Sequence, residues 1–203
     1  MSSRRPILMV VTDPSIPDLD ARVDAAIAGG ADWVQYRDKG ATTQERALWV
    51  AAFRQRHPLT LIVVNDDIEA ARLGGASGVH LSERGPATAV VGDALGPDSV
   101  AGCSIHSGSL RGGRWRDRGI GYVTFGTVYA SASHPGGPAA GLGKLKRACE
   151  VIARERPWMP VLAIGGIDAE RAAACIRVGA HGVAVIRSVL LAPQGTSRLV
   201  RSM

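Results

Sequence analysis

The sequence predicts an α/β fold, a short (β/α)8 TIM barrel. Eight short apolar runs rich in Val, Ile and Leu divide the chain, and segments with helical periodicity lie between several of them. The runs are apolar on both faces, which is typical of parallel strands covered by helices. Such strands close into a barrel or remain an open doubly wound sheet. We expect the barrel, because no GxGxxG sequence follows the first run.

The predicted strands are spaced so that a helix or a loop fits between each pair. They comprise residues 7–11, 33–37, 60–64, 78–81, 99–103, 121–125, 161–164 and 182–186. Helical periodicity covers residues 19–28, 43–56, 68–73, 142–155 and 169–178, with Asp168 as a candidate N-cap. The 203 residues are fewer than the roughly 250 that such barrels usually take, so we expect the last helix to be short.

A turn built around glycine recurs four times along the chain. The copies read "AGGADWVQYRD" from Ala28, "LGGASGVHLSE" from Leu73, "RGIGYVTFGTV" from Arg118 and "VGAHGVAVIRS" from Val178. In each copy a short apolar run follows the glycine, as in the connection from a helix C-terminus to a strand. The repeat predicts one supersecondary unit used several times, and we expect residues 1–203 to form a single domain.

Composition and charge restrict the function classes. The net charge is +6, but the basic residues are scattered and aromatic residues make up only 4%, so we expect small anionic ligands rather than nucleic acid. Cys103, Cys149 and Cys175 lie in apolar or helical segments without CxxC spacing, which indicates reduced core residues. The apolar run from Ile7 is too short for a signal peptide or a membrane span. We therefore expect a cytoplasmic protein without a membrane partner.

Polar residues follow the predicted strands at the end where (β/α)8 barrels carry their active sites. Gln35, Arg37 and Lys39 alternate along the second strand and its extension, so they share one side. A guanidinium and an ammonium on the same side suit a phosphate or diphosphate. An alternative is that Arg37 and Lys39 are surface residues paired with Asp38.

Two further strand ends carry candidate site residues. Asn65 and Asp66 end the third strand, where their oxygens could hold Mg²⁺ beside phosphate oxygens; the alternative is that they cap the next helix. Gly165 and Gly166 end the seventh strand, where glycine lets backbone N–H groups approach a phosphate; the alternative is a tight turn alone.

The histidines do not predict a metal site, because no HxH or HxxxH spacing occurs, and zinc is not expected. We interpret a single histidine such as His80 as structural, although His106 lies close to the predicted rim of the barrel.

Taken in order, eight segments resemble the thiamine phosphate synthase family, which includes the related thiazole tautomerases of the TenI type. They are Thr12-Asp13, "VQYRDK", "VVNDD", "GVHL", "GCSIHS", "YVTFGTVYASASH", "AIGGI" and "GVAVI". The resemblance extends over nearly the whole chain, and the fold of this family is a short (β/α)8 barrel.

The resemblance implies a transferase of thiamine biosynthesis that couples a pyrimidine methyl diphosphate to a thiazole phosphate and releases diphosphate. It implies diphosphate binding by Gln35, Arg37, Lys39 and Asn65, with Mg²⁺ bound by Asp66. The other positions that it implies are Ser131 and Ser133 near the phosphates and Gly166, Ile186 and Arg187 at the thiazole phosphate. Ser104 corresponds to a serine of the family, and we predict Ser104 and His134 as catalytic residues.

Three positions depart from the family pattern. Gly85 stands where the synthases usually carry a second metal carboxylate, and Glu83 is a nearby candidate replacement. His134 replaces a lysine that contacts diphosphate, and histidine is a weaker, pH-dependent cation. Arg187 replaces a serine and adds positive charge.

These departures leave two alternative functions open. One is a thiazole tautomerase, which moves a proton without a metal, although Thr127 stands at the position of its histidine. The other is a non-catalytic binder of phosphorylated thiamine precursors. In each case the expected partners are small phosphorylated pyrimidines or thiazoles, and so short a barrel is compatible with a homo-oligomer.

Overall fold

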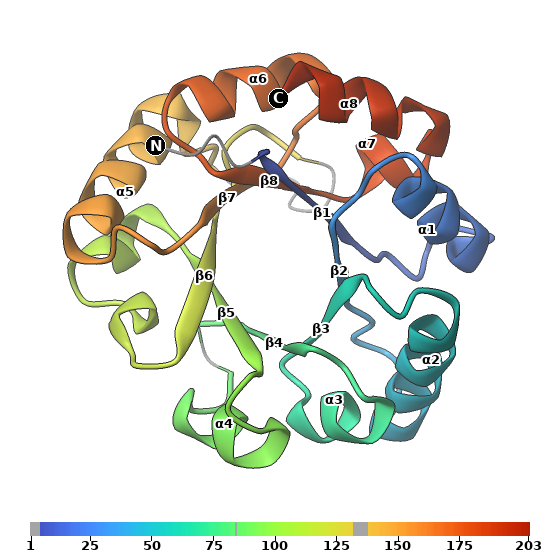
Figure 1. Cartoon of the computed structure of the whole chain (residues 1–203). Helices are drawn as coiled ribbons and strands as arrows, with labels where there is room; N and C mark the ends of the chain where they lie inside the picture. The colour runs from blue at the N-terminus through green and yellow to red at the C-terminus, as the bar shows by residue number, and fades with distance from the viewer. Residues whose placement is uncertain (1–4, 84, 132–137) are drawn as a thin grey trace.

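The computed structural model describes residues 5–83, 85–131 and 138–203, and its eight parallel strands form a closed barrel (Figure 1). The strands are β1 (Ile7–Val11), β2 (Trp33–Tyr36), β3 (Leu61–Asn65), β4 (Gly78–Leu81), β5 (Val100–Ile105), β6 (Ile120–Phe125), β7 (Val161–Ile164) and β8 (Gly182–Val185). Each strand pairs in parallel with the next, and β8 pairs with β1, so every strand has two neighbours. The predicted fold class is confirmed, and the open doubly wound sheet is wrong.

Helices form a ring outside the barrel (Figure 1). They are α1 (Leu19–Ala28), α2 (Thr43–Arg56), α3 (Ile68–Gly74), α4 (Ala89–Leu95), α5 (Gly141–Glu155), α6 (Ala169–Arg177), α7 (Arg187–Leu190) and α8 (Thr196–Ser202). The expected segments all form helices, and Asp168 caps α6 by accepting from the Arg171 N–H at 2.9 Å. The last helix is short, as expected, and packs against α6.

The sequence prediction missed α4 and the segment between β5 and β6. The seven residues of α4 include Gly92, which weakens a helical pattern already too short to show periodicity. Between β5 and β6 the chain forms two 3-10 helices, η1 (Ser107–Arg111) and η2 (Arg114–Arg116), where a full barrel unit would have an α-helix. These short connections explain how eight strands fit into so few residues.

The repeated turn has a glycine with positive φ in all four copies. Gly30, Gly75, Gly119 and Gly179 have φ angles of 105°, 68°, 91° and 108°, a region that side chains disfavour. In three copies the following alanine donates its N–H to the carbonyl five residues earlier, which is the Schellman pattern of helix C-termini; these bonds are Ala31 to Ala26, Ala76 to Ala71 and Ala180 to Cys175.

Buried apolar side chains lie on both sides of the sheet. The larger group lies between sheet and helices and includes Phe53 of α2 and Ile152 of α5. The smaller group lies inside the barrel and comprises Met9, Val11, Val63, Tyr122, Leu162 and Ala184. Gly102 makes room there, because a Cβ atom at this position would overlap the ring of Tyr122. The barrel is therefore packed at one end and hollow only at the other.

The three cysteines are buried and unpaired, as expected of core residues. Burial raises the pKa of the Cys103 and Cys149 thiols to about 12 and that of Cys175 to about 11. Within the described ranges, none of the helices has the length and apolar character required to span a bilayer.

Candidate active site

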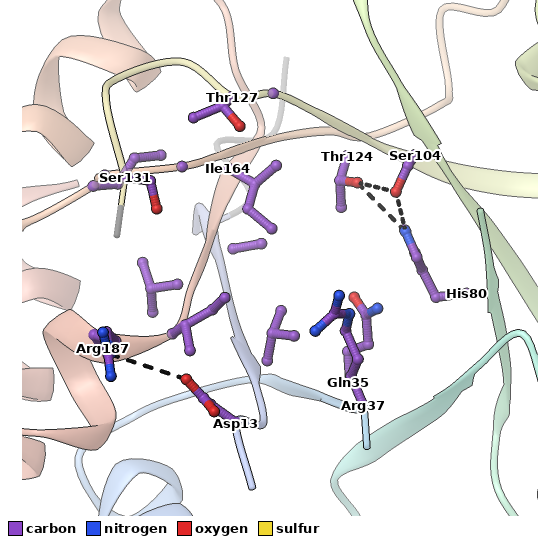
Figure 2. A pocket seen from close by; sticks show the side chains of 18 of the residues that line it. Asp13, Gln35, Arg37, His80, Ser104, Thr124, Thr127, Ser131, Ile164 and Arg187 are labelled. Carbon is purple, nitrogen blue, oxygen red and sulfur yellow. Dashed lines mark hydrogen bonds and ion pairs between the residues drawn. The ribbon is translucent and has the colours of Figure 1, made fainter. Parts of the chain in front are cut away.

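A pocket of about 880 Å³ opens where the strands end and the loops to the helices begin. Figure 2 shows its labelled side chains pointing into a common space. The predicted site residues that line it are Gln35, Arg37, Lys39, Asn65, Asp66, Ser104, Ser131, Gly166, Ile186 and Arg187. Ser133 and His134 lie outside the described residues.

The pocket is polar because the inward positions of the strands change character along their length. On β3 the interior residues are Leu61 and Val63, and Asn65 follows at the carboxyl end. On β6 the interior residue Tyr122 is followed, two positions on, by Thr124 in the pocket wall. Since side chains alternate in a strand, β3 and β6 each have an apolar residue in the packed layer and a polar residue in the layer above it.

Arg37 and Lys39 are placed by the backbone just after β2. The Thr12 hydroxyl accepts from the Arg37 N–H at 2.7 Å, and the Thr12 N–H donates to the Gln35 carbonyl at 3.0 Å. Asp38 accepts from the N–H groups of the two residues after Lys39, and within the described residues it forms no ion pair. The alternative in which Asp38 neutralises both cations is therefore not what the structure shows.

Three adjacent residues at the end of β3 have separate roles. Asp67 is the cap of α3, accepting from the Ala70 N–H at 2.8 Å, so Asn65 and Asp66 are not needed for capping. Although burial opposes ionisation of Asp67, hydrogen bonds from Ala70, Arg46 and Thr43 lower its pKa overall. Asn65 and Asp66 instead line the pocket.

Gln35, Asn65 and Asp66 form a hydrogen-bonded row. Gln35 Nε2 donates to Asn65 Oδ1 at 2.9 Å, and Asn65 Nδ2 donates to Asp66 Oδ2 at 3.1 Å. Each amide has a second N–H, which leaves one donor per amide for a ligand. Asp66 has a φ of 56°, which aspartate tolerates better than most residues, and its Oδ1 accepts from the Ser82 N–H at 2.7 Å.

The donor set around Asp66 can be compared with what Mg²⁺ requires. A Cβ atom at Gly85 would overlap Asp66 Oδ1, so this position of the carboxylate depends on the glycine. Glu83 lines the same pocket, and its Oε1 accepts from the Ser109 hydroxyl at 2.7 Å. Mg²⁺ is commonly held by one or two carboxylates together with substrate phosphates and water. The Asp66 carboxylate, in a pocket that Arg37 and Lys39 also line, fits this pattern.

A second region of the pocket surrounds the Gly165–Gly166 turn. Both glycines have positive φ angles, of 106° and 61°, and a Cβ atom at Gly166 would overlap the carbonyl of Ala130. Arg171, one turn into α6, donates to the Gly166 carbonyl at 2.7 Å and lies over the ring of Tyr129 at 4.9 Å. Contacts with Ala130 and Arg171 therefore fix the turn, and Arg171 lies in the pocket wall.

Arg187 reaches the pocket from the first residue of α7. Its Nε lies 4.0 Å from Asp13 Oδ2, as Figure 2 shows. The pKa of Asp13 is below its usual value, mainly because the Ser15 hydroxyl donates to it, with smaller contributions from the charges of Arg187 and Arg37. The carboxylate is ionised at neutral pH, so Arg187 has a fixed partner.

His80 and His106 occupy different environments at the pocket. His80 is 2% exposed, and its ring nitrogens contact the hydroxyls of Tyr122 and Ser104, each at 2.9 Å. His106 is exposed, and its Nδ1 lies 2.6 Å from the Gly126 carbonyl. Because a carbonyl only accepts, Nδ1 carries the proton in that bond, and Nε2 is left to accept or to be protonated.

The sequence interpretation missed Arg171, Tyr122 and Thr124. Arg171 lies within a helical segment, and nothing in its neighbours distinguishes it from an exposed helix residue. Tyr122 and Thr124 belong to an apolar run, where an inward direction follows only from counting two residues back from the end of the strand. That count is the signal that could have found Thr124.

Comparison with known proteins agrees with this geometry. The family model described as thiamine monophosphate synthase matches residues 8–189. A thiamine-phosphate synthase from Thioalkalivibrio sulfidiphilus is 38% identical over 187 residues, covering 89% of this chain and 86% of that protein. One from Thiobacillus denitrificans is 38% identical over 183 residues, covering 89% and 84%.

Among solved structures, thiamine phosphate pyrophosphorylase from Pyrococcus furiosus superposes with a TM-score of 0.82 and 27% identity. It covers 98% of this chain, and this chain covers 95% of it. The likeness therefore includes the whole barrel and the strand ends that form the pocket. On this evidence of sequence and fold, the chain belongs to the thiamine monophosphate synthase family.

Proposed function

We propose that this protein is a thiamine-phosphate synthase, a transferase that joins a pyrimidine methyl diphosphate to a thiazole phosphate and releases diphosphate. The observation that carries the proposal is the presence of two anion-binding regions in one pocket. Arg37 and Lys39 follow β2, whereas Arg171 donates to the Gly166 carbonyl after β7 and Arg187 follows β8. Two phosphorylated substrates require two such regions.

The row from Gln35 to Asp66 suits the departing diphosphate. In the reaction the bond between the methylene carbon and the diphosphate oxygen breaks, and its electron pair stays with the diphosphate. The ring nitrogen of the thiazole then forms a bond to that carbon with its lone pair. Arg37 and Lys39 supply positive charge where negative charge develops, and the second N–H groups of Gln35 and Asn65 donate to the same oxygens.

The other region suits a phosphate monoester. Backbone N–H groups at the glycine turn and the guanidinium groups of Arg171 and Arg187 are of the kind that bind phosphate in barrels of this type. Ile164 at the end of β7 and Ile186 just after β8 also line the pocket. These apolar side chains would exclude water from the electron-poor methylene carbon and so favour attack by the thiazole.

Asp66 is the residue that we propose would hold Mg²⁺, together with oxygens of the diphosphate. When bound, the ion would neutralise charge on the leaving group. Glu83 is the second carboxylate of the rim, and its contact with Ser109 would have to change for it to join the site.

The activity is tested by incubating the protein with both substrates and measuring thiamine phosphate, with and without Mg²⁺. We expect product with Mg²⁺ and little without it. Arg37→Gln should lower kcat/KM about 100-fold, as loss of one charge-stabilising group typically does. Arg147→Gln is the matched control, because Arg147 pairs with Glu150 on the exposed face of α5, and it should leave kcat/KM unchanged.

Absence of thiamine phosphate at saturating Mg²⁺ would rule out the synthase. Conversion of a carboxylated thiazole phosphate to its aromatic tautomer would then identify a tautomerase. Binding of both substrates in calorimetry with neither reaction would identify a binding protein.

A further inference from the structure

His80 lies at the floor of the pocket, in contact with three hydroxyl groups. Its Nδ1 is 2.9 Å from the Tyr122 hydroxyl, and its Nε2 is 2.9 Å from the Ser104 hydroxyl. Thr124 Oγ1 lies 3.5 Å from His80 Nε2 and 3.4 Å from Ser104 Oγ (Figure 2). The rings of His80 and Tyr122 are also in contact, with centroids 5.6 Å apart.

The buried hydrogen-bond donors determine which ring nitrogen of His80 carries the proton. Tyr122 is fully buried, and in the part of the chain that the structure describes its hydroxyl bonds only to His80. If Nδ1 carried a proton, the Tyr122 O–H would be buried without an acceptor, which costs about 1–3 kcal/mol. If Tyr122 donates to Nδ1, every buried donor is satisfied, and the proton of His80 is on Nε2.

The imidazole is neutral under ordinary conditions. Burial disfavours a charged ring, and a second proton, on Nδ1, would leave the Tyr122 O–H without its acceptor. Burial also raises the pKa of Tyr122 well above its usual value, so the phenol keeps its proton. The ring therefore carries one proton, on Nε2, so it accepts from Tyr122 at Nδ1 and donates to Ser104 at Nε2.

We propose that the chain Tyr122–His80–Ser104 makes Ser104 a hydrogen-bond donor toward the substrate, with His80 as its positioning residue. Tyr122 donates to Nδ1, Nε2 donates to Ser104 Oγ, and Thr124 also donates to that oxygen. Ser104 has two lone pairs and one proton. With both lone pairs occupied, its O–H points into the pocket.

A Ser104 hydroxyl that can only donate restricts the kind of substrate atom that it can bind. A hydroxyl fixed as a donor selects an acceptor, such as a ring nitrogen, and disfavours an amino group at the same place. This inference rests on the proposed function, in which Ser104 lies near the row that binds the diphosphate. Because His80 pairs with Asn65 of that row in the sheet and contacts Ser104, we assign the partner of Ser104 to an acceptor atom of the pyrimidine diphosphate rather than to the thiazole phosphate.

The tautomer can be measured without any activity. In the full chain labelled with ¹⁵N-histidine, we expect His80 to show a protonated Nε2 and an unprotonated Nδ1 at pH 7. The resonance is identified by its loss in His80→Gln. In Tyr122→Phe, the Nδ1 signal should move toward that of a nitrogen that accepts no hydrogen bond. A proton on Nδ1, or on both nitrogens, in the wild-type protein would overturn the proposal.

Kinetics test the link to Ser104. Ser104→Ala and His80→Leu should each lower kcat/KM for the pyrimidine diphosphate about tenfold, with little change in KM for the thiazole phosphate. The double variant should be no worse than Ser104→Ala, because both changes remove one interaction. His80→Gln should recover most of the loss, since its side-chain amide can donate to Ser104 in place of Nε2.

The two proposals fail differently. If the wild-type protein makes no thiamine phosphate, the proposed function is wrong while the tautomer is unaffected. If the wild-type protein is active but folded His80→Leu keeps its kcat/KM, or the double variant is additive, the role of His80 is wrong.

Discussion

Adjacent residues in the sequence have different roles because they form different hydrogen bonds. Asn65, Asp66 and Asp67 follow one another in the sequence, yet only Asp67 caps a helix, while the other two face the pocket. His80 is one position from Leu81, which packs against the helices. At both places the direction of the side chain, rather than the residue type, decides whether a group contributes to stability or to the site.

Burial of His80 should make the protein sensitive to acid. The pKa of His80 is about 4 in the folded chain against 6.5 when exposed, so the unfolded state binds more protons between these values. Stability is therefore lost as the pH falls through this window. We expect the free energy of unfolding to drop by roughly 2–3 kcal/mol more in the wild type than in His80→Gln between pH 7 and pH 4.5.

Urea denaturation at the two pH values measures this difference. The carboxylates with lowered pKa values, such as Asp67, also lose stability in acid, but they do so equally in both proteins. Equal losses in the wild type and in His80→Gln would show that His80 is not the group responsible.

The capping box of α2 is a second test at the residue scale. The Thr42 hydroxyl accepts from the Glu45 N–H at 3.2 Å, and the Glu45 carboxylate accepts from the Thr42 N–H at 2.7 Å. Thr42→Ala removes one of these two bonds and should lower the free energy of unfolding by about 1 kcal/mol. Thermal unfolding checks this, with Thr43→Ser as a control that leaves the box intact; equal melting temperatures for wild type and Thr42→Ala would contradict it.

Among the elements, the strands tolerate little change because the interior of the barrel is filled. Gly102 of β5 lies against the ring of Tyr122, and Gly78 of β4 lies against the backbone of Val100. The outer helix α4 has more freedom, because a Cβ atom at its Gly92 would meet no atom within 4 Å. Glycines therefore have different roles inside and outside the sheet.

Two alanine substitutions compare these roles. Gly102→Ala should lower the free energy of unfolding by about 3 kcal/mol, because the new methyl group overlaps the Tyr122 ring. Gly92→Ala in α4 meets no atom within 4 Å and should raise it by up to about 1 kcal/mol. Urea denaturation of both variants measures the contrast, and similar effects from the two changes would contradict the packing described for β5.

In the whole molecule, closure of the sheet brings charges from distant parts of the sequence to one rim. Arg37 and Arg187 are 150 positions apart in the chain but line the same pocket, because β8 and β2 both pair with β1. A phosphorylated ligand that binds these cations binds only the folded chain, because unfolding separates them. Binding should therefore stabilise the fold.

Inorganic diphosphate should stabilise the fold. At 100 times its Kd, a ligand that binds only the folded state adds about 2.7 kcal/mol, which for about 200 residues corresponds to roughly 5–10 °C in Tm. We expect this increase in the wild type and not in an Arg37→Gln, Lys39→Gln double variant. Sodium chloride at equal ionic strength is the control, and the same rise in both proteins would show that diphosphate binds elsewhere.

Much of the fold and part of the site follow from local sequence patterns. The strands and five helices have a periodicity that neighbouring residues establish, and the glycine turns reflect a backbone preference of one residue type. The strand-end position of Gln35, Arg37 and Asn65 is likewise a local property. Because all strands are parallel, these ends meet at one rim, and the sequence alone identified that rim.

What the sequence could not provide depends on contacts between distant segments. It left open whether Asn65, Asp66 or Asp67 would cap α3, and it gave no sign that Arg171 lies over Tyr129 in the pocket wall. It interpreted His80 as an isolated structural histidine, whereas three strands join it to Tyr122 and Ser104. The sequence by itself determined the barrel and the end at which chemistry can occur; the tertiary structure decided which side chains meet there, because the direction and burial of each depend on neighbours far away in the chain.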